Sequence, residues 1–425
     1  MKSFLNNSYL TSGVLSGRTN LSTGIRPTLD LSKGGADLIR GPNANQKLPA
    51  AQWANTWPAP QATLDLDFAN NRGWVKGVGQ GSAMQAVTFT RASTGNYIDN
   101  TGTLQSATNN VPRFDWASMD RTGSGTQASP YVISLVASST CNGLLIEQAS
   151  TNQLKWCRDA TQSNWTKTNC TAAKTYTGID GVANGCTQLT ATSGSATCVQ
   201  TYTVASGSYT SSIYLYPVTV TGNIQVSMDG STWSTVTLIA GQWNRIVLSA
   251  TLANPTVGIL IQNSGDVVAM DYGQIENLAF VTTPILTTSA SATRAVDSAT
   301  MSRTNFVSWY NPNGGTAYAS GVTLAPSGGG TPNAFVIDDG TATNFIRLNL
   351  SSAGASSVAL GITVASTSYT GSTLTSWANS NISAASFTAT RAASALNGGN
   401  LSFVQLPRLP LISGYSGITF RIGAN

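Results

Sequence analysis

The sequence predicts an all-β protein with two β-sandwich units behind an irregular N-terminal arm. Charged residues make up only 9% of the 425 residues, against about 25% in ordinary soluble domains. Long runs of the Leu, Glu, Lys and Ala residues that favour helices are absent. Hydrophobic residues make up 41%, which is enough to build sizeable cores. Short segments that alternate apolar and polar residues recur between Gly, Asn, Asp and Pro, as strands and turns do.

The first segment, residues 1–62, differs from the rest of the chain. It mixes Gly, Pro and Asn with short apolar islands and has no sustained hydrophobic period. We expect an extended arm that becomes ordered only by packing on another surface, so that deletion of residues 1–60 leaves the β units folded. The apolar islands are the expected attachment anchors: Phe4, Leu5, Leu38, Ile39, Trp53 and Trp57.

Residues 63–153 form a β-rich entry segment. "TLDLDFA" alternates as a half-buried strand does, and "GNYIDNTGTLQSA" is typical of two strands joined by a turn. Charged residues near the expected strand ends predict a buried polar network that fixes the register between this segment and the next unit. The predicted members are Arg91, Asp99, Arg113, Asp115 and Glu147.

The remaining chain predicts two sandwiches and a connection. Residues 154–285 hold short strands at the spacing of a jelly roll, including a hairpin turn at Asp229-Gly230. Residues 286–301 are rich in Thr, Ser and Ala and are interpreted as a linker. Residues 302–425 give a further strand series for the second sandwich.

Composition excludes several kinds of chemistry. The chain has no histidine, which removes His-based triads and imidazole metal sites. It has two glutamates, which leaves few carboxylate pairs for glycoside hydrolysis. No Lys/Arg cluster stands out, so we expect no nucleic-acid surface. Five cysteines without a Cys-x-x-Cys pair predict buried, reduced thiols, with one disulfide as the alternative. No apolar run indicates a secretory signal or a membrane span. We expect no cofactor and no metal.

Aromatic residues offer the candidate ligand contacts, because sugars stack their apolar faces on exposed rings. Core packing is the competing explanation for each ring. The glycan-binding candidates are Trp165, Tyr214, Trp233, Trp243 and Trp377. A calcium site at Asp338-Asp339-Gly340 with Asn344 is a further alternative, although a polar hairpin turn explains that motif more simply.

Several ordered motifs carry a resemblance to a known family. "LDLDFA", "VTFTRASTGNYIDNTGTLQSA", "NVPRFD" and "GLLIEQASTNQL" are followed by "MDGSTWSTV", "YGQIENLAFVTTPI" and "ATRAVDSATM". Together they resemble phage virion proteins of the tail-fibre or head-fibre kind, over about residues 63–301. The resemblance implies a jelly roll similar to carbohydrate-binding modules. Residues 302–425 more loosely resemble a concanavalin A-like or laminin-G-like sandwich. Ser150 departs from the family, which commonly has an Arg there.

The resemblance implies a non-enzymatic structural protein of a phage virion, assembled in the host bacterial cytoplasm and attached through its N-terminal arm. Its expected partners are other virion proteins of the capsid, collar or tail, further copies of itself, with a trimer as the expected form, and a host-surface glycan. Two alternatives stay open. One is a polysaccharide depolymerase, with Asp229, Asp271 and Glu276 as the candidate carboxylates. The other is a capsid cement protein without a ligand.

Overall fold

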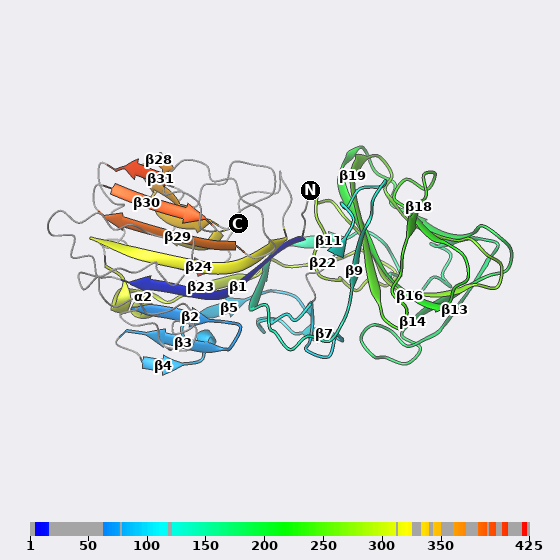
Figure 1. Ribbon diagram of the computed structural model, residues 1–425, viewed down its shortest axis with the longest axis horizontal. Helices are drawn as coiled ribbons and strands as arrows, with labels where there is room; N and C mark the ends of the chain where they lie inside the picture. The colour runs from blue at the N-terminus through cyan, green and yellow to red at the C-terminus, as the bar shows by residue number, and fades with distance from the viewer. Residues whose placement is uncertain are drawn as a thin grey trace.

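A computed structural model gives the fold over the described part of the chain, and it confirms the all-β prediction. The described ranges are 5–16, 63–76, 79–117, 121–311, 313–324, 333–339, 343–349, 360–370, 381–388, 391–396, 402–406 and 419–422. Antiparallel strands dominate them, alongside the helix α2 (Arg303–Trp309) and the 3-10 turn η2 (Ala83–Gln85). Figure 1 shows two lobes joined by a narrower middle part.

The first lobe, on the left in Figure 1, is a sandwich of two large sheets. In strand order, the first sheet runs β31 (Ser402–Gln405), β30 (Arg391–Leu396), β29 (Asn381–Thr388), β24 (Gly314–Leu324), β1 (Leu5–Ser16), β2 (Leu64–Asp67), β3 (Arg72–Val75) and β4 (Gly79–Gly81), with β10 (Leu144–Glu147) also paired to β1. The second runs β28 (Thr367–Thr370), β27 (Leu360–Val364), β26 (Phe345–Asn349), β25 (Asn333–Asp338), β32 (Thr419–Ile422), β23 (Ser298–Met301) and β5 (Thr88–Thr90).

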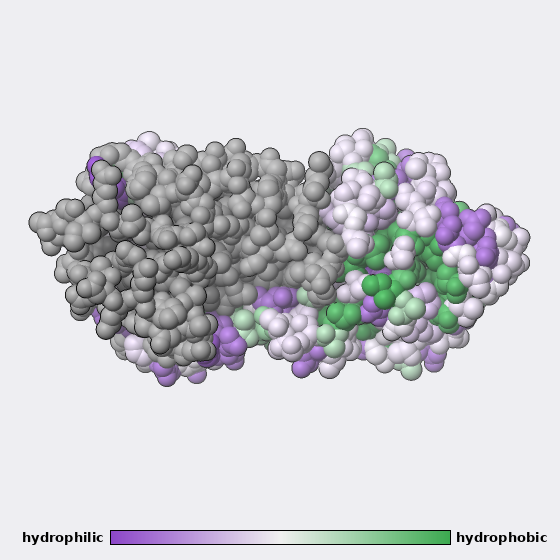
Figure 2. Space-filling model, viewed as in Figure 1, coloured by the Kyte–Doolittle hydropathy of each residue, from purple (hydrophilic) through white to green (hydrophobic). Residues whose placement is uncertain are grey.

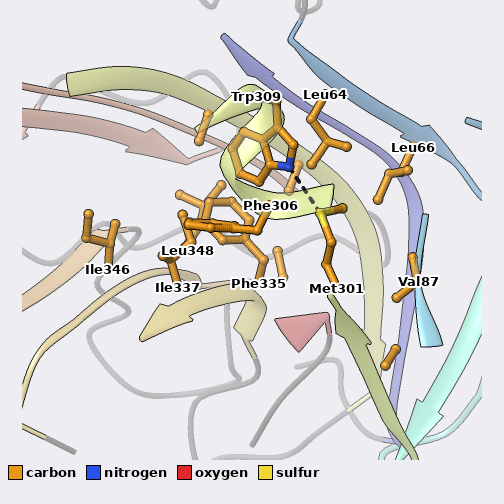
Figure 3. Packing of buried hydrophobic residues seen from close by; sticks show 14 of the residues in the cluster. Leu64, Leu66, Val87, Met301, Phe306, Trp309, Phe335, Ile337, Ile346 and Leu348 are labelled. Atoms are coloured by element: carbon orange, nitrogen blue, oxygen red, sulfur yellow. Dashed lines mark hydrogen bonds between the residues drawn. The ribbon is translucent and has the colours of Figure 1, made fainter. Parts of the chain in front are cut away.

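The core of the first lobe lies between these sheets and takes residues from both ends of the chain. Leu64 and Leu66 of β2 pack in one cluster with Phe335 of β25, and Figure 3 shows α2 placing Phe306 and Trp309 among them. The helix begins at Ser302, whose hydroxyl accepts the Asn305 backbone N–H as an N-cap. The Trp309 indole N–H points to the Met301 sulfur at 3.0 Å.

The second lobe, on the right in Figure 1, is another two-sheet sandwich. Its larger sheet runs β13 (Cys170–Tyr176), β14 (Cys186–Ala191), β21 (Val267–Glu276), β16 (Gly207–Thr219), β19 (Asn244–Leu252), β9 (Tyr131–Ser134) and β8 (Arg121–Thr122). Its smaller sheet runs β12 (Thr166–Thr168), β15 (Ala196–Thr201), β20 (Thr256–Ile261), β17 (Ile224–Ser227) and β18 (Ser234–Val236). Between the two sheets lies a core that includes Ile213, Leu215 and Met270.

Two short two-stranded sheets lie where the chain passes between the lobes. β6 (Gly95–Ile98) pairs with β7 (Leu104–Ala107), and β11 (Ser150–Asn152) pairs with β22 (Ala292–Arg294). The turn between β6 and β7 needs a left-handed residue, which Gly102 provides at φ 81°. The turn predicted at Asp229-Gly230 joins β17 to β18, with Gly230 at φ 74°.

The structure differs from the expected irregular arm at its beginning. Residues 5–16 are the strand β1, which lies between β24 and β2 in the first sheet. Leu5 pairs with Leu324 there, so its backbone belongs to the sandwich and not to a free anchor. A strand in the interior of a sheet satisfies its backbone groups on both sides, which a search for hydrophobic periods alone does not detect. The other anchors, Phe4, Leu38, Ile39, Trp53 and Trp57, lie outside the described residues.

The sheets also cross the expected segment boundaries. Strands β2 to β5 of the entry segment belong to the first lobe, together with the C-terminal strands, whereas β9 joins the second lobe. The expected linker at 286–301 contains β22 and β23, and β23 pairs with both β5 and β32. Sheet pairing depends on backbone hydrogen bonds between edges and not on closeness in sequence, so composition could not reveal these partners.

Candidate functional site

The main cluster of charged side chains is a buried network between the lobes, here called the joint network. Its centre is Arg113, whose side chain is fully buried, as is that of Glu147. Arg113 Nη1 donates to Glu147 Oε2 at 2.7 Å, to Asn96 O at 2.8 Å and to Thr283 Oγ1 at 3.0 Å. Arg113 Nη2 donates to Asp297 Oδ2. One guanidinium therefore connects the strand ends of both lobes.

Two further arginines complete the joint network. Arg91 donates to Asp297 Oδ1 at 3.2 Å and to the carbonyls of Ala107 and Thr108 at 3.1 and 2.9 Å. Arg294 Nε lies 3.4 Å from Glu147 Oε2. Asp297 also accepts the Glu147 backbone N–H at 2.7 Å. Glu147 is thus shared between two arginines and Asp297 among three, since Arg294 Nη1 also lies 3.8 Å from Asp297 Oδ2. This arrangement compensates the cost of burying charge.

The electrostatics of Glu147 follow from this arrangement. Burial disfavours the ionised carboxylate, but the charges of Arg294 and Arg113 and the hydrogen bonds from Thr283 outweigh that effect and lower the pKa of Glu147 to about 2. Thr283 contributes its backbone N–H to Oε1 at 2.8 Å and its hydroxyl to Oε2 at 2.7 Å. Glu147 is therefore ionised at neutral pH.

The predicted network members separate into two groups. Arg91, Arg113 and Glu147 meet in the joint network, whereas Asp99 and Asp115 serve turns. Asp99 accepts the backbone N–H groups of Thr101 and Thr103, because its carboxylate is one residue past the end of β6. Asp115 accepts the backbone N–H groups of Ile98 at 2.7 Å and Ala117 at 3.3 Å.

Sequence reasoning missed two members, Arg294 and Asp297. Both fall in "ATRAVDSATM", inside the segment interpreted as a linker. A signal was available: in a chain with so few charges, an Arg and an Asp three residues apart in a Thr/Ser/Ala-rich segment are unusual, and that motif also belongs to the resemblance.

Most of the aromatic candidates lie in the core or outside the described residues. Trp165 is 1% exposed, and its indole N–H donates to Trp156 O at 3.0 Å. Tyr214 is 2% exposed and lies under the Arg245 guanidinium, 5.2 Å from the ring centre. Both rings fill space between layers, as large aromatics do in sandwiches. Trp377 lies outside the described residues.

Trp243 remains half-buried and belongs to an aromatic group with two tyrosines. Its ring lies 5.6 Å from that of Tyr216 and 6.3 Å from that of Tyr176, and the two tyrosine rings are 5.5 Å apart, centre to centre. We call Tyr176, Tyr216 and Trp243 the aromatic triad. Tyr216 was missed, although it follows Tyr214 by two residues and so shares its face of β16.

Trp233 lies on the opposite side of the second lobe. A Cβ built at Gly258 would lie 3.1 Å from the Trp233 ring, so the ring covers the backbone of β20. Val257 and Ile259 point into the core, which places Gly258 and Trp233 on the outer face of the smaller sheet. Trp233 and Trp243 therefore do not form one platform.

The three carboxylates of the depolymerase alternative are all engaged. Asp229 accepts the N–H groups of Ser231 and Thr232 at its own turn. Asp271 makes a two-point ion pair with Arg158, at 2.7 and 3.0 Å. Glu276 is buried and accepts hydroxyls from Ser150 at 2.6 Å and Thr282 at 2.5 Å.

The relative placement of Asp271 and Glu276 corrects one expectation. Five residues apart on a regular strand, they should face opposite sides. A bulge at Tyr272, with φ 45°, changes this, because Asp271 pairs with Tyr214 and Glu276 with Thr210. The two acids thus share a face. Their partners Tyr214 and Thr210 are four residues apart on β16, which is about 13 Å along the strand. This distance is more than the carboxylate spacing of either class of glycosidase.

The cysteines are all free thiols, as predicted, and four of the five are buried. Burial raises the pKa of Cys157 to about 11, so its thiol is a weak nucleophile at neutral pH. No group of three or more His, Cys, Asp or Glu residues in the described part of the chain is arranged to hold a metal. Within the same part, Asn344 donates to Asp339 at 3.0 Å in the turn before β26.

No protein-family model matches the chain, and no curated protein matches it. In the described residues no helix has both the length and the apolar character needed to cross a membrane.

Proposed function

We propose that this chain is a structural component of a phage virion, a tail-fibre, head-fibre or decoration protein that acts by assembly and by contact with a host-surface glycan. The ordered motifs of residues 63–301 support this proposal through their resemblance to fibre-like virion proteins. The all-β architecture agrees with it, although a fold alone does not decide function.

The observation that carries the proposal is the joint network. Three arginines and two carboxylates, with side chains at most 1% exposed, connect the two lobes. Buried charges that are held by several ion pairs and hydrogen bonds resist rearrangement. A fixed relation between the lobes suits a particle component that transmits position. It suits less well an enzyme whose domains must open and close.

Location in the particle tests the proposal directly. Purified virions would be labelled with antibodies to the second lobe and viewed by electron microscopy, with mass spectrometry of the same particles as a second measurement. We expect a defined position on the capsid, collar or tail, in a fixed copy number. Absence of the chain from purified particles would refute the structural role.

The depolymerase is the second candidate, and a separate assay distinguishes it. Purified protein would be incubated with capsule or lipopolysaccharide from the host, and reducing ends would be measured. We expect none, because Asp271 and Glu276 are committed to Arg158, Ser150 and Thr282. New reducing ends that disappear in Glu276→Gln would favour the enzyme.

A further inference from the structure

The aromatic triad lies on the outer face of the larger sheet of the second lobe, beside the part that the β6–β7 pair covers. Ile98 and Leu104 of that pair cover the outer face of β16 as far as Tyr214, in a cluster with Leu135 and Tyr272. Tyr216 lies two residues farther along the same face and is half-buried. Trp243 packs on the edge of the cluster.

The triad is held in place by its own contacts. Tyr216 and Trp243 meet at an interplanar angle of 65°, and Tyr176 and Trp243 at 77°, both edge-on, which is the favoured geometry for aromatic pairs. Three segments far apart in sequence therefore present one preformed group of rings, so that a ligand would meet a rigid surface.

The surroundings of the triad are polar but nearly free of uncompensated charge. Arg158, at the nearby end of the sheet, is paired with Asp180 and Asp271 by two hydrogen bonds each. Gln188 lies on the same face, in register with Tyr216 across β21, and its side-chain amide has no partner within the described residues. Lys174 is an exposed cation on β13, two residues before Tyr176.

Apolar side chains also reach solvent close to the triad in sequence. Val182 is 52% exposed, Val218 38% and Ile239 50%. Two hydrogen bonds between Ile239 and Asn244 hold the loop that carries Ile239 against the strand that follows Trp243. Figure 2 shows hydrophobic residues gathered on the visible face of the second lobe, where Figure 1 labels β14 and β16.

We propose that the aromatic triad is a saccharide-binding site, with Tyr216 and Trp243 stacking on sugar rings and the Gln188 amide hydrogen-bonding to hydroxyls. Rings give apolar area for the faces of a sugar, and an unpaired amide beside them both donates and accepts. An acidic peptide would need free positive charge, and Arg158 is already paired with two aspartates. This inference rests on the proposed contact with a host glycan and names its site.

The test uses the full chain and an array of bacterial surface polysaccharides with neutral oligosaccharides as probes. Hits would be titrated by tryptophan fluorescence and isothermal calorimetry. We expect millimolar to micromolar binding, weakened about tenfold or more in Trp243→Ala and Tyr216→Ala. Tyr216→Phe keeps the ring and should bind nearly as well. Trp233→Ala, on the opposite face, is the matched control and should bind like the unmodified chain. Melting curves would verify that each variant is folded.

Three outcomes would overturn the inference. The first is no saccharide binding at millimolar concentration. The second is binding that Trp243→Ala and Tyr216→Ala leave intact but Trp233→Ala abolishes. The third is a loss of self-association in Trp243→Ala, measured by sedimentation, with saccharide binding unchanged, which would make the face a contact between copies. If virion labelling succeeds while saccharides do not bind, the structural role stands and only this site fails.

Discussion

Replacement of Glu147 by glutamine should destabilise the protein strongly. The Glu147 side chain is fully buried, 2.7 Å from Arg113 Nη1 and 3.4 Å from Arg294 Nε. Gln keeps the shape but removes the charge, which leaves Asp297 as the remaining carboxylate beside three buried arginines. Breaking a buried pair on one side costs about 3–5 kcal/mol. At roughly 2–4 °C per kcal/mol for a unit of this size, Tm should fall by about 6–20 °C.

Differential scanning calorimetry at neutral pH measures this change, and Asp99→Asn is the matched control. Asp99 accepts N–H groups in the β6–β7 turn, and Asn can still accept there, so the control should cost about 1 kcal/mol. If Glu147→Gln lowers Tm no more than the control does, the joint network does not stabilise the fold as argued.

Three further predictions follow from the same structure. Folding lowers the pKa of Glu147 to about 2 from 4.5, so its ionisation stabilises the folded state above the unfolded pKa. This stabilisation, about 3 kcal/mol, is lost as pH falls toward 2. The fall in Tm between about pH 5 and 2 should therefore be shallower in Glu147→Gln. Deletion of residues 1–16 removes β1 from between β24 and β2. Calorimetry should then show loss of the first lobe's cooperative transition while the second lobe still melts. An unchanged melting profile would count against β1 as a structural strand. Because burial raises the pKa of Cys157 and of Cys170 to about 11, Ellman's reagent should react slowly with the native protein, at half-buried Cys170 first, and with all five thiols after denaturation; a rapid native reaction at Cys157 would contradict its burial.

The fold class and several local elements could be predicted from the sequence, because they depend on local patterns. "TLDLDFA" does give a strand, although Asp65 and Asp67 are buried as well as the leucines, so the strand is not half-buried. The turn at Asp229-Gly230 does give a hairpin. What the sequence could not show is long-range pairing. Residues of β1 have no clear hydrophobic period, yet they pair with β24, about 300 residues away in the sequence. Such pairing depends on which strand edges remain open when the chain is compact.

The candidate site was predictable only in part, for a related reason. Arg113 and Glu147 could be recognised as rare charges near strand ends, and they do meet. Their partner Asp297 is 150 residues from Glu147 in sequence, so no spacing rule connects the two. Exposure was the other difficulty, since Tyr214 and Tyr216 share one face of β16 but only Tyr214 is covered. The cover is the β6–β7 pair, whose docking position is a tertiary property.

The path of the chain explains why the charges gather at the joint. After β5 the chain leaves the first lobe, reaches the second at β8 and β9, returns at β10, leaves again for β12 to β21, and comes back at β23. Three of these four passages carry members of the joint network: Arg91 follows β5 and Arg113 precedes β8 on the first, Glu147 ends β10, and Asp297 precedes β23. Backbone carbonyls that are buried at such passages need hydrogen-bond partners, and the arginines supply them at Asn96, Ala107, Thr108 and Gln148. The same side chains thereby satisfy the crossing backbone and fix the two lobes, so that a change at any one of them should disturb the relation between the lobes before it disturbs either sandwich.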